Sequence, residues 1–132
     1  MHATLPFSAI SPLTRKLLWA DAAIEAVIAA VLLGVVGRPH WWLNVDRTVT
    51  LTGAAVFAVA AVAIGLAAWN RRTSAEFVQY LAFANIVGGL AVWAIAILRW
   101  DRFEDEGRSL VGAGADAFIL IGIMELVALR RR

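Results

Sequence analysis

The chain contains no cysteine and only two histidines, His2 and His40, among its 132 residues. Without cysteine there are no disulfide bonds, no thiolate ligands for a metal and no covalent attachment of haem. Both histidines lie outside the apolar segments, so those segments hold no imidazole that could bind a haem or a metal. We therefore expect neither a cofactor nor a metal site.

Polar residues are also scarce. Hydrophobic residues make up 61% of the chain, and the mean hydropathy is +0.76, whereas a soluble domain is usually ~45–50% apolar. A soluble four-helix protein needs polar outer faces, and this chain has too few polar residues to supply them. The composition indicates a membrane protein, with the lipid bilayer as its surroundings, and the length suits a single domain over 1–132.

The basic residues occur in short clusters. Eleven of the twelve are Arg, and the net charge is only +2. Because no continuous basic face could follow a phosphate backbone, we do not expect a nucleic-acid partner. The acidic run at 104–106 could bind cations weakly, but the neighbouring Arg102 and Arg108 favour a solvated loop whose charges compensate one another.

Four apolar segments are long enough to cross a bilayer, which needs about 20 residues per helix. They cover 16–36, 48–69, 77–98 and 110–129, and they are separated by "GRPHWWLNVDR", "NRRTSAE" and "RWDRFEDEGR". The first segment begins like a signal peptide, but its apolar stretch is too long, contains two acids and lacks a cleavage site before Gly37. The sequence therefore predicts an all-α polytopic protein with four transmembrane helices in an up-down bundle.

The charges of the connections predict the orientation. Seven basic residues lie in the N-terminal tail, the 70–76 connection and the C-terminus, against five on the opposite side. Since basic residues favour the cytoplasmic side, we expect both termini in the cytoplasm and a location in a bacterial cytoplasmic membrane. Tryptophans at the predicted helix ends, where the membrane interface favours them, fit this arrangement: Trp41, Trp42, Trp69 and Trp100.

Small residues recur at every fourth position of the first segment. Membrane helices associate through close backbone approach, because lipid tails compete for apolar contacts. We therefore predict a helix-packing face there, which meets either this chain or another: Ala22, Ala26, Ala30 and Gly34. The second, third and fourth segments also carry small residues, among them Gly88, Gly89, Gly112, Gly114, Ala117 and Gly122.

A faint internal repeat relates the two halves. "LLWAD" at 17–21 resembles "LAFAN" at 81–85, and "LTGAA" at 51–55 resembles "LVGAG" at 110–114. The halves would then be two helical hairpins of the same orientation. Matches this short also arise by chance in alanine-rich helices, so duplication and coincidence both stay open.

Polar side chains within the apolar segments are the best lead to function: Asp21, Glu25, Asn85, Asp116 and Glu125. Counted from the predicted cytoplasmic ends of the segments, Asp21 and Glu125 lie at one shallow depth in the membrane, and Glu25 and Asn85 lie at a deeper one. No basic residue lies in a segment core, and such acids normally face the bundle interior or a cavity. Our hypothesis is that Glu25 is protonated, or shares a proton, and is hydrogen-bonded to Asn85. Asp21 and Glu125 are shallow enough for Lys16, Arg15 or Arg130 to reach them.

Two interpretations of these acids remain open. A structural role suits Asp21 and Glu125, because acids one turn inside a helix end are often hydrated. For Glu25 with Asn85 a functional role weighs equally, because an interhelical polar contact contributes only about 0.6 kcal/mol on average. Asp116 lies near the outer interface and suits either packing or a site.

Four blocks of the sequence resemble small four-span bacterial integral membrane proteins that have no assigned activity. These blocks are "LLWADAAIE", "LAFANIVGGLAVW", "GRSLVGAGADA" and "MELVALRRR". The shared marks are Ala20-Asp21-Ala22, Asn85, Gly107-Arg108, and Glu125 followed by Arg130–Arg132. A weaker similarity links the chain to DoxX-like four-helix membrane proteins. The resemblance implies the four-span fold and no mechanism.

Motifs of catalysis are absent: the sequence contains no GxSxG, Walker, HExxH or DxD pattern. We therefore expect a non-enzymatic membrane protein that acts through helix contacts, as an accessory subunit of another membrane protein or as a homo-oligomer. The alternative is a small proton- or cation-linked transporter or channel that uses the intramembrane carboxylates. An enzyme acting on lipid has the least support, since only the acids could form its reactive cluster.

Overall fold

The computed structural model describes residues 9–36 and 46–131. Within these ranges there are four long helices, α1 (Pro12–Val36), α2 (Arg47–Trp69), α3 (Ala75–Leu98) and α4 (Asp105–Arg130), and a short 3₁₀ helix, η1 (Trp100–Arg102). Each of the four long helices is long and apolar enough to cross a membrane. The predicted all-helical class is confirmed, and so are the four candidate membrane spans.

All four long helices begin before the predicted apolar segments, and polar side chains cap the first three. At the start of α1, the Ser11 hydroxyl accepts a hydrogen bond from the Thr14 amide at 3.1 Å, and Pro12 occupies the first helical position, where its missing N–H is no loss. Asp46 and Ser74 cap α2 and α3 in the same way. As a result α1 begins four residues before 16. α4 begins five residues before 110 without a side-chain cap, and acidic Asp105 and Glu106 lie in its first turn.

Large apolar side chains cover the outside of the molecule. Many of them are exposed on the helix surfaces, and they include Val59, Val62, Leu66, Tyr80 and Ile97. A soluble monomer rarely exposes contiguous apolar patches beyond a few hundred Å². Together with the four apolar helices, this surface is consistent with a multi-pass membrane protein.

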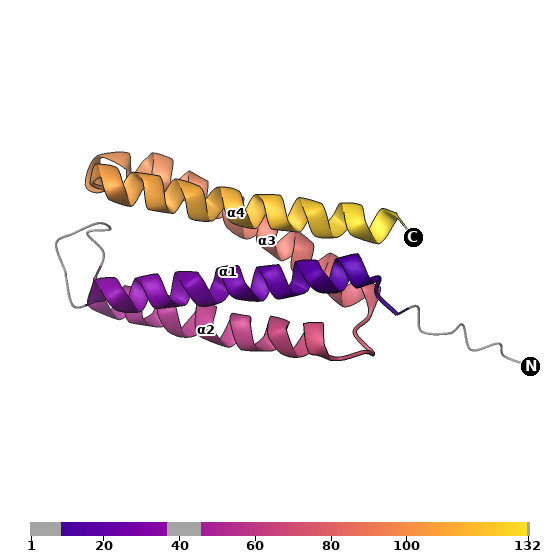
Figure 1. Cartoon of the computed structure of the whole chain (residues 1–132). Helices are drawn as coiled ribbons and strands as arrows, with labels where there is room; N and C mark the ends of the chain where they lie inside the picture. Colours follow the sequence, from indigo (N-terminus) through magenta and orange to yellow (C-terminus); the bar gives the residue numbers. More distant parts are fainter. Residues whose placement is uncertain (1–8, 37–45, 132) are drawn as a thin grey trace, which may run out of the picture.

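The four helices form two pairs. α1 packs along α2, α3 packs along α4, and the two pairs meet mainly through α1 and α4, whereas α2 and α3 make few contacts with each other. In Figure 1, α1 runs along α2, α3 slants from behind the start of α1 up to α4, and the start of α1 and the end of α4 lie at the same end of the molecule. We call α1 with α2 the first hairpin and α3 with α4 the second hairpin.

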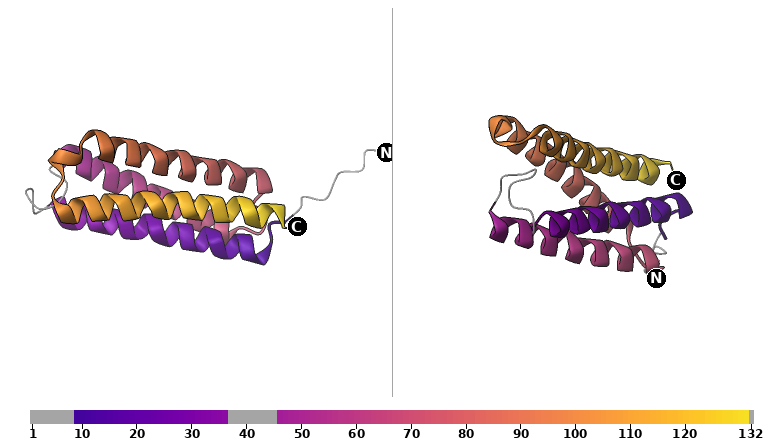
Figure 2. Two further views of the ribbon diagram at one scale, coloured as in Figure 1. Left: turned by 90° about the horizontal axis from the view of Figure 1, so that it is seen from above. Right: turned by 60° about the vertical axis from the view of Figure 1, so that its left-hand side comes forward.

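The two ends of the interface between the hairpins differ. Where α1 begins and α4 ends, which we call the closed end, buried Leu18, Ile64 and Val78 form one core, with Leu129 of α4 packed against it. At the opposite end, the open end, a cleft of about 580 Å³ lies between α1 and α4. The ribbons of the two hairpins diverge toward this end in both Figure 1 and the right-hand view of Figure 2.

Candidate functional site

Four polar side chains from three helices come together toward the closed end. Asp21 and Glu25 come from α1, Asn85 from α3 and Glu125 from α4. Asp21 and Glu125 are 0% exposed, and Glu25 and Asn85 are only 5% and 6% exposed. We call these four residues the polar cluster. The structure thus unites four of the five polar residues singled out in the sequence.

One hydrogen bond joins the two hairpins within the polar cluster. The Asn85 side-chain amide donates to an Asp21 carboxylate oxygen at 2.8 Å. The predicted bond from Asn85 to Glu25 is therefore wrong. Because α1 begins at Pro12, Asp21 lies nine residues into its helix, and Asn85 lies ten residues into α3, so the two side chains share one level.

Glu25 and Glu125 lie close to Asp21 without direct bonds to it. Both carboxyls lie near enough to Asp21 to interact with it electrostatically, and Glu125 also lies beside Asn85. Four buried oxygen atoms have no hydrogen-bond partner within 9–36 and 46–131: Asp21 Oδ1, Glu25 Oε2, Glu125 Oε1 and Glu125 Oε2. A buried oxygen without a partner is costly, so the cluster has unused capacity to accept hydrogen bonds or to hold protons.

Among the described residues, no basic side chain forms an ion pair with this cluster. Arg15 points its guanidinium to the end of α2, where it donates to the Ala68 carbonyl and, at 3.0 Å, to the Asn70 carbonyl. Within 9–36 and 46–131, the one ion pair joins Arg108 to Asp105. Lys16, Arg15 and Arg130 therefore form no ion pair with Asp21 or Glu125 within the described residues, and Arg15 instead binds carbonyls at the end of α2.

Close contact between α3 and α4 sets the position of Asn85. A Cβ atom at Gly122 would lie 2.6 Å from the Ala82 carbonyl oxygen and 3.3 Å from the Asn85 Cβ. At Gly89, one turn further along α3, a Cβ would lie 2.7 Å from the Ala115 carbonyl oxygen. Only glycine permits this approach, which brings α3 against α4 at the level where Asn85 and Glu125 meet Asp21.

Asp116 lies apart from the polar cluster. Its carboxylate accepts a hydrogen bond from the Trp93 indole N–H at 2.8 Å, and this bond links α4 to α3 within the second hairpin. The Trp93 ring also lies against Gly112, where a Cβ would come within 3.2 Å of it. The sequence left Asp116 undecided, and the structure gives it a packing contact. Trp93 was not singled out in the sequence, because nothing in the pattern distinguishes it from an interfacial tryptophan.

The small-residue row of α1 divides between inside and outside. Ala22 is buried and faces Gly65 of α2. A Cβ atom added at Gly65 would lie 4.0 Å from the Ala22 Cβ, which is an ordinary contact distance. Ala26, Ala30 and Gly34 are exposed, and a Cβ at Gly34 would meet no atom within 4 Å. Within this chain, only the first member of the row takes part in packing.

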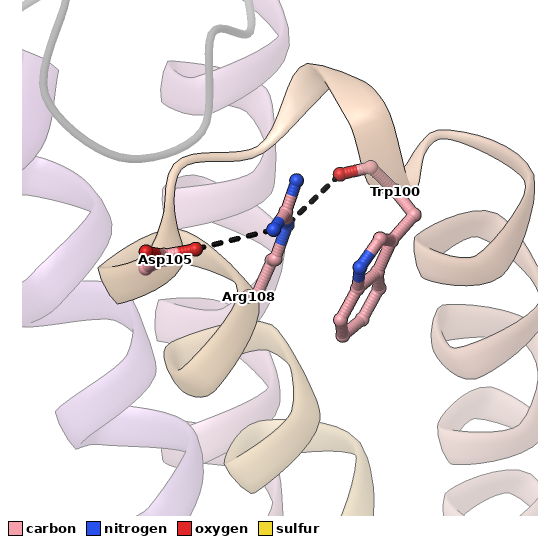
Figure 3. Close-up of polar contacts among 3 residues, drawn as sticks. All are labelled: Trp100, Asp105 and Arg108. Carbon is pink, nitrogen blue, oxygen red and sulfur yellow. Dashed lines mark hydrogen bonds and ion pairs between the residues drawn. The ribbon is translucent and has the colours of Figure 1, made fainter.

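A second polar group fixes the connection between α3 and α4 at the open end (Figure 3). Arg108 donates to the Trp100 carbonyl at 3.0 Å and to the Asp105 carboxylate at 3.1 Å. Its guanidinium also lies 5.1 Å from the centre of the Trp100 ring. The pair of Arg108 with Asp105 agrees with the predicted compensation of charges in this connection, and Glu106 takes no part in that pair.

Within the described ranges, no group of three or more His, Cys, Asp or Glu is arranged to hold a metal ion. His2, His40, Arg38, Trp41, Trp42 and Arg132, which entered the sequence predictions, lie outside the described residues. Comparison with protein-family models, with curated proteins and with solved structures gives no match.

Proposed function

We propose that the chain is a proton-linked membrane transporter whose proton-binding site is the polar cluster, Asp21, Glu25, Asn85 and Glu125. One observation carries the proposal: four carboxyl oxygens of the cluster are buried without a hydrogen-bond partner among the described residues. Intramembrane acids in this situation mark ion and proton pathways in other membrane proteins.

Protons suit this cluster better than larger cations. The carboxyls are not arranged as a metal-binding group within the described residues, whereas a proton needs only one oxygen and turns that oxygen into a hydrogen-bond donor. Three carboxyls from α1 and α4 with a single amide donor from α3 can share protons among themselves. Neighbouring acids that interact in this way take up and release protons as a group.

The position of the cluster also suits exchange with one aqueous phase. Glu125 lies five residues before the end of α4, which is about 8 Å along a helix.

Seven basic residues on this side against five on the other support cytoplasmic termini, an up-down bundle and a bacterial cytoplasmic membrane. Because the chain has no cysteine, Ser74→Cys and Asp101→Cys report the orientation directly. An impermeant maleimide added outside intact cells should label only Asp101→Cys.

Proton flux into liposomes that contain a trapped pH-sensitive dye tests the proposed function. We expect Glu125→Gln and Asp21→Asn each to lower the flux about tenfold or more, because each removes one exchangeable carboxyl from the cluster. Infrared spectra of the same samples should show the carbonyl band of a protonated carboxyl, and Glu25→Gln should change that band.

Asp116→Asn is the matched control for these variants. It makes the same acid-to-amide change in α4, and the amide oxygen still accepts from Trp93. We expect its flux to equal that of the wild type. A folded wild type without proton flux, or an equal loss in Asp116→Asn, would contradict the proposal.

A second candidate function rests on the exposed part of the small-residue row. Ala26, Ala30 and Gly34 lie on the lipid-facing side of α1 with four-residue spacing, which suits a further helix from a second copy or from an accessory partner. Native mass spectrometry of the protein in mild detergent tests it. We expect a fixed complex in the wild type and its loss in Ala30→Leu, with Gly88→Leu on exposed α3 as the control.

A further inference from the structure

The cleft at the open end is lined by apolar side chains from both hairpins. On α1 they extend from Ala23 to Leu32, on α4 from Leu110 to Phe118, and Phe57 and Val92 complete the walls. Its volume of about 580 Å³ falls within the ~300–1,000 Å³ of small-molecule sites. An apolar cavity does not hold water stably, so hydrocarbon is the chemistry that fits it.

The length of the cleft matches one leaflet of a bilayer. Ala23 and Leu32 are nine residues apart on α1, which corresponds to about 14 Å along the helix. Half of a hydrocarbon core is about 15 Å thick. The cleft therefore extends from the level of the membrane centre to the outer part of the open end, as the acyl chain of a single lipid does.

The mouth of the cleft is acidic. A shallow hollow lined by Asp105, Glu106, Ser109 and Leu110 adjoins the cleft, and the two share Leu110. Glu106 stands one turn before Leu110 on the α4 face that also carries Ala113 and Ala117. Asp105 already pairs with Arg108, so Glu106 is the carboxylate that complements a positive group at the mouth.

We infer that this cleft binds one acyl chain of a membrane phospholipid, and that Glu106 contacts an ammonium group of its head. An apolar cleft one leaflet deep below an acidic rim is complementary to phosphatidylethanolamine. The site shares no residue with the polar cluster, so it goes beyond the proposed proton-linked function and can fail or succeed independently of it.

Two glycines offer a matched pair of variants. A Cβ at Gly114 meets no atom within 4 Å although the residue lines the cleft, and a Cβ at Gly88, exposed on α3, also meets none. Gly114→Leu therefore has open space for its Cβ and extends a side chain at the cleft, and Gly88→Leu makes the same change outside it. Ala117→Leu fills the cleft from a second position, and thermal unfolding confirms that each variant is folded.

The experiment is native mass spectrometry of the detergent-purified protein, titrated with phosphatidylethanolamine or with phosphatidylglycerol of identical acyl chains. We expect one lipid bound per chain in the wild type and in Gly88→Leu. Gly114→Leu and Ala117→Leu should bind both lipids about tenfold more weakly or worse, because their side chains occupy the space of the acyl chain.

The head-group contact has its own control. We expect the wild type to prefer phosphatidylethanolamine about threefold, the size of an exposed ion pair. Glu106→Gln should abolish the preference, and Glu104→Gln, outside the hollow, should keep it. Unchanged lipid binding in both cleft-filling variants, or a second copy of the chain bound in place of lipid, would overturn the acyl-chain site. Equal binding of the two lipids by the wild type would overturn the role of Glu106.

Discussion

The two ends of the interface between the hairpins use different chemistry. At the closed end the hairpins share a hydrogen bond from Asn85 to Asp21 and a packed core, whereas at the open end only apolar side chains face one another across a cleft. In a bilayer, lipid tails replace apolar contacts at little cost. The difference shows that helices in this protein are held together where polar groups and small residues meet, and separate where they do not.

The largest expected effect comes from breaking the close contact that supports the closed end. Gly122→Leu places a side chain against the Ala82 carbonyl, so α3 must move away from α4. We expect the free energy of unfolding to fall by about 3 kcal/mol, measured by denaturant unfolding in detergent. Gly88→Leu, with no atom within 4 Å of its Cβ, is the control, and equal stability of the two variants would contradict the close-contact argument.

The hydrogen bond between the hairpins is the next test of the comparison. A double-mutant cycle of Asp21→Ala and Asn85→Ala isolates its contribution. We expect a coupling free energy of about 1 kcal/mol, within the range for polar contacts between membrane helices. A cycle of Asp21→Ala with Asp116→Ala should give no coupling, since Asp116 bonds to Trp93 instead. No coupling in the first cycle would mean that the bond does not join the hairpins.

A smaller effect is expected within the second hairpin. Trp93→Phe removes the indole N–H that Asp116 accepts but keeps an aromatic ring against Gly112. We expect a loss of about 0.6 kcal/mol in the free energy of unfolding and no change in proton flux. The structure separates the Asp116–Trp93 contact from the polar cluster. A drop in proton flux like that of Glu125→Gln would contradict this separation, because it would show that the two polar regions act together.

The smallest perturbation sharpens the comparison without weakening the fold. Spin labels on cysteines introduced at Leu13 and Val127 measure the distance between α1 and α4 at the closed end. Labels at Leu33 and Ser109 measure the same distance at the open end, and all four residues are exposed. Electron–electron resonance should give a narrow distance distribution at the closed end and a broader one at the open end. Distributions of equal width would mean that apolar contacts hold the open end equally well.

The helices were predictable from the sequence, because length, hydropathy and the breaks between segments define them. The pairing of Asp21 with Asn85 was missed, since the count of depth began at 16 and Ser11 with Pro12 starts the helix earlier. The partner of Arg15 was missed because backbone carbonyls at a helix end leave no mark in the sequence.

The packing faces were predictable only in part. Helices that are apolar all round carry no stripe that distinguishes inside from outside, so a regular row of small residues does not show which members face the same chain. In α1 the row places Ala22 inside and Ala26, Ala30 and Gly34 on the surface. Glycines that meet a backbone carbonyl across the helix pair, Gly89 and Gly122, look in the sequence like any other small residue.

The division into two hairpins has a consequence for biosynthesis. The first hairpin leaves the ribosome before α3 exists, so Asp21 and Glu25 enter the membrane before Asn85 and Glu125 can meet them. The early hairpin must therefore be inserted with these acids still lacking their later neighbours, a state that membrane insertion tolerates at a cost of a few kcal/mol per acid. Since α2 and α3 make few contacts, we expect residues 1–72 and 73–132, synthesised as separate chains, to reassemble in the same membrane.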